Sequence, residues 1–161
     1  MKIIVWNSQD KCVADYHKLI RGCDVLCLLD CGQWTVPVYA LQIQNGLFHW
    51  KDEHEGLSYD IFYCLEKVAF ICRDGLYSGE SVLYSIHSNI GSLVGIRLQD
   101  DFWLFANHES NRSNACHIGE FYLREISDRF RKAAFIADFK KKSYSWVQET
   151  VGKLYCIALP E

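Results

Sequence analysis

The sequence predicts an α/β domain of the mixed α+β type, because a strand, a helix and a strand open the chain and a run of short strands follows. Residues 2–6 and 24–29 are each continuous apolar runs after a first charged residue, Lys2 or Asp24, which is typical of strands buried on both faces of a parallel sheet. Later runs of β-branched and aromatic residues are separated by turn sequences, a spacing typical of antiparallel meanders. An apolar stripe at helical spacing over residues 118–130 then predicts an amphipathic helix.

Length and composition limit the possible classes of protein. The chain has 161 residues, and we expect residues 1–161 to form one domain with a sizeable core. Hydrophobic residues make up 50% of it, which argues against disorder, and the net charge of −3 gives no overall attraction for nucleic acid or anionic lipid. No apolar run reaches the roughly 18 residues that span a bilayer, and we see no signal peptide. We therefore expect no membrane insertion and a cytoplasmic location, with delivery as a toxin or effector left open.

The opening elements place polar residues at strand ends. The first strand ends at Asn7, and Asp10 can cap a helix that stops at residues 21–22. The second strand ends at Asp30. Because parallel strands end at the same edge of a sheet, Asn7 and Asp30 are expected to be neighbours.

The rest of the chain alternates irregular and regular segments. Residues 33–56, with a polar cluster at 49–54, are expected to form a solvated loop. A buried strand over residues 133–137 leads to Asp138, and a short helix over 143–150 is expected next. The other strands are expected at residues 58–65, 67–72, 81–86, 92–98, 102–107 and 154–159.

Cysteines are numerous but scattered. The chain has 8, within apolar segments, and we expect them to be reduced thiols in the core. Cys23, Cys27 and Cys31 would share one face of a strand, but they lack the Cys-x2-Cys spacing of structural zinc sites. A zinc site is therefore disfavoured.

Residues 101–110 form an aromatic strand that turns polar at Asn107 and His108. A polar cluster at the end of a doubly buried strand is a common position for chemistry, although such a strand can also simply end in a turn, here residues 111–114. Together with Asn7, Asp30 and Asp138, these residues have a recognisable chemistry. Carboxylates and an amide can hold a hard divalent cation, and a histidine can protonate a leaving oxygen.

With these motifs in this order, the sequence resembles the endonuclease/exonuclease/phosphatase superfamily, which has the deoxyribonuclease I-like fold. The resemblance is closest to the active subunits of cytolethal distending toxins. Residues 6–9 are similar to the first-strand motif, and residues 25–32 to a segment in which Asp30 takes the place of a metal-binding Glu. Residues 68–73 resemble the strand that carries a phosphate-contacting Arg. Residues 91–98 resemble the strand before the catalytic one, and residues 135–139 resemble the Gly-Asp-Phe-Asn motif.

This resemblance implies a compact, truncated four-layer α/β/β/α sandwich and a magnesium-dependent phosphodiesterase, most simply a nuclease acting on DNA or RNA. The implied catalytic residues are His108 and Asp138, and the implied metal ligands are Asp30 and Asn7. The implied phosphate-binding residues are Arg73, Asn107 and Lys140.

The sequence also departs from the family pattern. Lys140 stands where the family has a phosphate-binding Asn, and the terminal Ser-Asp-His motif, which supplies a second carboxylate and a histidine, is missing. His117 or Glu120 could replace the missing base.

Two alternatives therefore stay open. In the first, the domain is catalytically impaired and binds or inhibits a nucleic acid or protein partner. Its contacts would be residues 140–142 and some of the tryptophans, although these could equally be a solubilising turn and core residues. The second alternative is a phosphatase acting on a small phosphorylated molecule.

Overall fold

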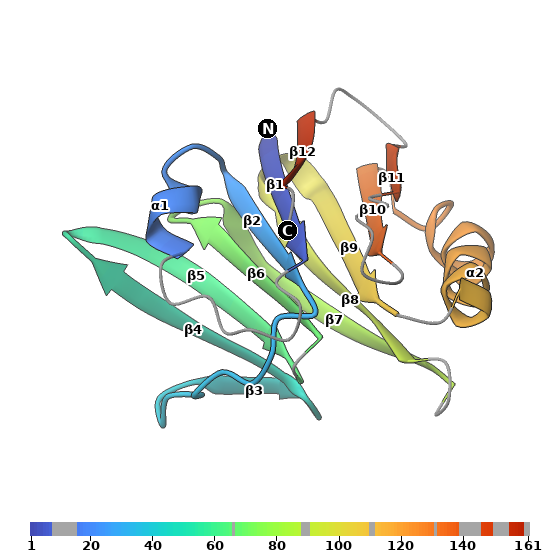
Figure 1. The fold of residues 1–161 in the computed structure, drawn as a ribbon, viewed down its shortest axis with the longest axis horizontal. Helices are drawn as coiled ribbons and strands as arrows, with labels where there is room; N and C mark the ends of the chain where they lie inside the picture. The colour runs from blue at the N-terminus through green and yellow to red at the C-terminus, as the bar shows by residue number, and fades with distance from the viewer. Residues whose placement is uncertain are drawn as a thin grey trace.

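Two mixed β-sheets pack face to face (Figure 1). The computed structural model describes residues 1–7, 16–65, 67–87, 91–109, 112–130, 132–138, 146–149 and 155–159. Asn7 and Asp138 are placed by their backbone alone. No helix in these ranges is long and apolar enough to cross a membrane.

The first sheet has seven strands in the order β12-β1-β2-β6-β5-β4-β3. Strands β1 and β2 flank the short helix α1 (Tyr16–Ile20) in sequence, and β1 pairs in parallel with both β2 and β12. The remaining pairs of this sheet are antiparallel. Its strands are β1 (Lys2–Asn7), β2 (Val25–Leu29), β3 (Leu41–Gln44), β4 (Leu47–His54), β5 (Leu57–Cys64), β6 (Val68–Arg73) and β12 (Tyr155–Leu159).

The second sheet has five strands in the order β11-β10-β9-β8-β7. Strands β9 and β10 are parallel, and the other pairs are antiparallel. A 3-10 turn, η1 (Gln99–Asp101), joins β8 to β9, and helix α2 (Arg112–Phe121) continues into a π-helical segment, η2 (Tyr122–Ile126), before β10. Its strands are β7 (Tyr77–His87), β8 (Gly91–Leu98), β9 (Phe102–His108), β10 (Lys132–Asp138) and β11 (Trp146–Glu149).

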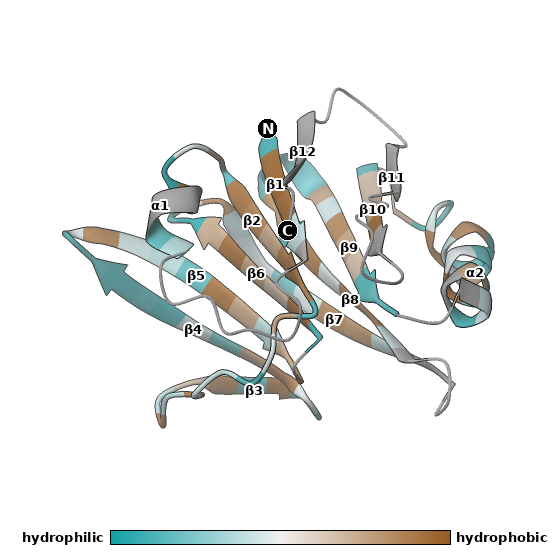
Figure 2. Ribbon diagram, viewed as in Figure 1, coloured by the Kyte–Doolittle hydropathy of each residue, from teal (hydrophilic) through white to brown (hydrophobic). Residues whose placement is uncertain are grey.

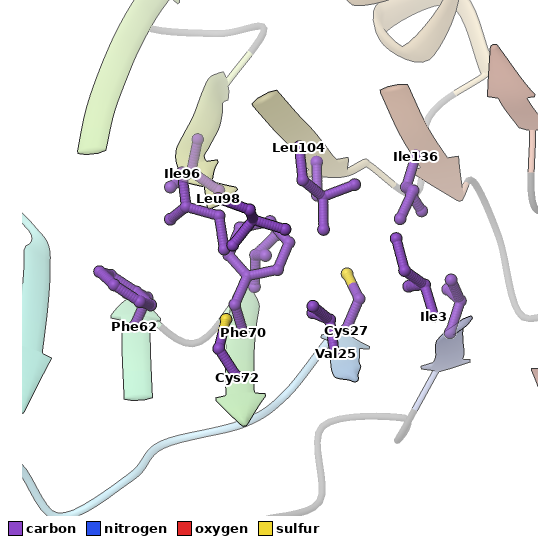
Figure 3. Packing of buried hydrophobic residues seen from close by; sticks show 14 of the residues in the cluster. Ile3, Val25, Cys27, Phe62, Phe70, Cys72, Ile96, Leu98, Leu104 and Ile136 are labelled. Atoms are coloured by element: carbon purple, nitrogen blue, oxygen red, sulfur yellow. The ribbon is translucent and has the colours of Figure 1, made fainter. Parts of the chain in front are cut away.

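The main core lies between the two sheets. In β2, Val25, Cys27 and Leu29 face this core, whereas Leu26 and Leu28 face the outer side of the sheet, so the whole strand is buried. This two-sided burial explains the unbroken apolar run in the sequence. Figure 3 shows side chains of the two sheets pointing toward one another, among them Ile3, Cys27, Phe62, Phe70, Ile96, Leu104 and Ile136.

Helices cover part of each outer face. The predicted stripe on the later helix is confirmed, because Ile118, Tyr122 and Ile126 are fully buried against the second sheet. A complete four-layer α/β/β/α sandwich is not shown, since the described helical cover consists of α1, α2 and η2 on a mainly β structure.

Three of the tryptophans belong to the core, whereas Trp6 is partly buried and packs against the outer cluster of the first sheet. Trp34 and Trp50 are buried in the outer cluster of the first sheet, and Trp103 is buried beneath α2 and η2. Of the two alternatives left open for these three residues, contact surface or core, the structure shows the core. The side chain of Trp146 lies outside the description.

Two secondary-structure predictions are wrong. Residues 33–56 contain β3 and β4 rather than only a loop, and residues 146–149 form β11 rather than a helix. Figure 2 shows that β4 is hydrophilic along most of its length. Its backbone nevertheless pairs with β5 over eight residues, from Leu47 to His54, and such pairing does not require apolar side chains.

The six cysteines whose side chains the structure describes form no disulfide with one another, and all except the exposed Cys116 are buried. Cys27 faces the core between the sheets, whereas Cys23 and Cys31 belong to the outer cluster, so the three do not share a face. Burial raises the pKa of Cys23 and of Cys64 to about 11, because the thiolate loses its hydration. These cysteines are core residues, as predicted.

Gly95 in β8 is required by its close approach to the Phe105 ring. A Cβ atom at this position would lie 2.4 Å from Cε1 and 2.6 Å from Cδ1 of Phe105, whose ring is fully buried. We expect Gly95→Ala to lower the free energy of unfolding by about 1–3 kcal/mol, measured by urea denaturation. In a Phe105→Leu background the same change should cost less, and an equal cost would contradict this explanation.

Candidate active site at the carboxyl ends of the strands

Four of the predicted site residues lie at strand ends on one edge of the sandwich. In the first sheet, Asn7 is the register partner of Leu29, so Asn7 and Asp30 end neighbouring parallel strands. In the second sheet, Asp138 is the register partner of His108. Parallel pairing thus makes Asn7 a neighbour of Asp30 in the first sheet and Asp138 a neighbour of His108 in the second.

His108 and Asp30 make a contact between these two pairs. His108 Nε2 lies 3.9 Å from Asp30 Oδ1, and the two side chains are 12% and 35% exposed. This separation is within ion-pair range but longer than a hydrogen bond. The packing of one sheet on the other therefore joins two residues that are far apart in sequence, as the strand-end pattern predicted.

The backbone of Asp30 turns sharply after β2. Its φ of 51° lies in the left-handed region, which Asp adopts more readily than most residues. Its N–H donates a hydrogen bond of 2.7 Å to the Lys67 carbonyl. This turn ends the strand and holds the Asp30 carboxylate at the edge of the sheet.

The other ring nitrogen of His108 is buried. Nδ1 has no hydrogen-bond partner among the residues that the structure describes. Asp138 is adjacent in register, but its side chain is outside the description, so its role in orienting His108 stays a prediction.

Asn107 fills a structural role. Its side chain is 1% exposed, and Nδ2 donates a hydrogen bond of 2.6 Å to the Ser92 carbonyl. Its Oδ1 is buried without a partner in the described part of the chain. This burial does not fit the predicted phosphate contact; instead, the amide ties the end of β9 to the beginning of β8.

Arg73 lies at the opposite edge of the first sheet. Its guanidinium Nη2 is 3.1 Å from Asp24 Oδ1, just before β2 begins, whereas Asp30 follows the end of β2. Because β6 is antiparallel to β2, the end of β6 meets the beginning of β2, and a phosphate contact at the His108 edge does not fit.

The remaining candidates are not placed in the site. Lys140 lies outside the described residues, as do Lys141 and Lys142. His117 and Glu120 are exposed on α2, and no contact with the His108–Asp30 pair is observed for either within the described residues.

The chemistry of the strand ends suits a hard cation, although the described side chains do not complete a site. Asp30 offers a carboxylate, and Asn7 and Asp138 are oxygen-bearing residues at the same edge, which are the ligand types that Mg²⁺ prefers. Among the described side chains, no group of three His, Cys, Asp or Glu could hold a metal ion.

The Asn107–Ser92 hydrogen bond can be tested by replacing the amide with a carboxyl group. We expect Asn107→Asp to destabilise the fold by about 2 kcal/mol or more at neutral pH, because a buried carboxylate would face a carbonyl oxygen. Burial should raise the pKa of the introduced carboxyl, so the folded state would bind more protons than the unfolded state. The loss of stability relative to wild type should therefore grow as pH rises above about 4. Urea denaturation across pH measures this, and a pH-independent loss would contradict it.

Solved structures with a similar fold were found, whereas the sequence matches no protein-family model and no curated protein. One is the structure of CdtB, described as the biologically active subunit of cytolethal distending toxin, with a TM-score of 0.58 and 16% identity. The superposed part covers 84% of this chain and 66% of the CdtB chain. Another is the cytolethal distending toxin of Haemophilus ducreyi, with a TM-score of 0.53, 16% identity and coverage of 84% and 65%.

The chain spans about two thirds of the length of these two proteins. At this level of identity the likeness establishes the fold alone. The predicted resemblance is thereby confirmed at the level of structure: the chain has a deoxyribonuclease I-like fold similar to that of CdtB.

Proposed function

We propose that the protein is a metal-dependent phosphodiesterase, most simply a nuclease that cleaves DNA or RNA. The observation that carries this proposal is the contact of His108 with Asp30 across the two sheets, at the carboxyl ends of their strands. The similarity of the fold to CdtB supports it. Titratable groups that converge at one edge of a rigid scaffold are typical of catalytic sites.

Each residue of this edge has a role in the proposed reaction. Asp30, with Asn7 and Asp138, would hold a divalent cation, and a bound Mg²⁺ supplies positive charge that stabilises the phosphate in the transition state. His108 would donate a proton to the leaving oxygen. Because its side chain is only 12% exposed, water screens its interaction with charge weakly.

Cleavage of plasmid DNA and of single-stranded RNA in the presence of Mg²⁺ tests the proposal. We expect His108→Ala to reduce the rate by about 100-fold or more, since acid–base groups contribute at least that much. Asp30→Asn and removal of the metal with EDTA should have comparable effects. Arg73→Ala is a matched control that should retain activity, because Arg73 lies at the opposite edge of the sheet. Undiminished cleavage by the His108 and Asp30 variants would refute the proposal.

A second candidate function is binding without catalysis. It is favoured by the lack of a three-residue metal cluster among the described side chains. Such a domain would recognise a nucleic acid or a protein through the same fold.

Calorimetric titration with Mg²⁺ separates the two candidates. A phosphodiesterase should show saturable binding that Asp30→Asn abolishes, because the substitution removes the charged oxygen ligand of the site. Absence of binding to the wild-type protein would favour the non-catalytic function.

A further inference from the structure

A separate pocket lies at the opposite edge of the first sheet from His108 and Asp30. It has a volume of about 360 Å³ and is formed where the end of α1, the turn between β4 and β5 and the end of β6 meet. Figure 1 shows α1 beside the end of β6. This volume is within the range of small-molecule sites.

The floor of the pocket is apolar. Ile20, Cys23 and Tyr59 line it and are almost completely buried, whereas Leu57 at the rim is 50% exposed. Burial keeps the Cys23 thiol protonated by raising its pKa, so this side chain adds no charge at neutral pH. The floor can therefore accept an apolar group.

Two arginines line the walls. Arg21 contacts the Glu55 carboxylate and Arg73 contacts that of Asp24, and the arginine side chains are 55% and 61% exposed. A guanidinium carries five N–H donors, and each of these ion pairs joins a single guanidinium nitrogen to the carboxylate. No further partner of either guanidinium is observed within the described residues, so the remaining donors can bind a ligand.

Asp74 also lines the pocket, and its negative charge is paired with a lysine outside the pocket. Asp74 Oδ1 lies 3.0 Å from Lys51 Nζ, and Lys51 is not among the lining residues. The pocket thus combines an apolar floor with two guanidinium groups whose donors are only partly used.

We propose that this pocket binds a small organic anion, a carboxylate or phosphate monoester attached to a ring or another apolar group. The apolar group would rest on the floor, and the anion would accept hydrogen bonds from Arg21 and Arg73. Arginine binds both carboxylates and phosphates through paired N–H donors. The site does not depend on the proposed phosphodiesterase activity, because it shares no residue with the His108 edge.

Binding can be measured by NMR titration of the full chain in EDTA, with phenyl phosphate and benzoate as anionic probes and benzamidine as the cationic control. We expect saturable shifts for the anions at residues 20–23, 57–59 and 73–74, and none for benzamidine. Tighter binding of phenyl phosphate would identify the ligand as a phosphate monoester, and tighter binding of benzoate as a carboxylate. Lack of saturation by both anions, or equal binding of benzamidine, would overturn the proposal.

Substitutions test the assignment of the residues. Arg21→Gln and Arg73→Gln should each weaken binding about tenfold, the effect of one charge-assisted hydrogen bond. Leu57→Glu should abolish binding by placing a negative charge at the rim, whereas Leu57→Gln, which has nearly the same size, should retain it. Both changes fall on a half-exposed side chain, so both variants should fold, and thermal unfolding checks this.

The His108→Ala variant separates this proposal from the proposed function. It should bind the anions as the wild type does, whatever its effect on cleavage. Equal affinity of the Leu57→Glu and Leu57→Gln variants, or loss of binding in His108→Ala, would overturn the pocket assignment.

Discussion

The apolar contact between the two sheets determines the rest of the structure. One buried cluster contains Val25 and Cys27 of β2 together with Leu104 and Ala106 of β9. Packing within this cluster fixes the position of β2 relative to β9 along the strand direction. Because side chains alternate along a strand, a shift of one residue would turn each apolar set to the wrong face. The meeting of Asp30 with His108 is thus a consequence of hydrophobic packing, and a polar contact of 3.9 Å would be too weak to impose it.

Backbone features at the strand ends refine this arrangement. Asp30 leaves β2 in a left-handed conformation, and Asn107 bonds the end of β9 to Ser92. These two local features fix the ends of β2 and β9, where Asp30 and His108 lie, while the strands behind them remain buried. The sheets thus form a rigid scaffold, and the candidate residues lie at the ends of its strands.

The sequence predicts the buried strands well because an apolar run or an alternating pattern reports burial directly. It fails at β4, where residues 51–54 are charged or polar, because pairing with β5 through the backbone outweighs side-chain polarity. It also fails at β11, which pairs antiparallel with the preceding strand β10. For the site, the strand-end pattern correctly groups Asn7, Asp30, His108 and Asp138 at one edge, by backbone position for Asn7 and Asp138.

The local order and periodicity of the sequence are enough to identify the strand-end residues and the apolar faces behind them. The positions of the other predicted site residues depend on the tertiary structure. Antiparallel pairing places Arg73 at the end of the sheet away from His108, and there it lines a pocket with Arg21. Asn107 is buried and bonded to the Ser92 carbonyl. The physical reason is that strand direction and sheet packing depend on contacts between distant residues, which no local pattern records.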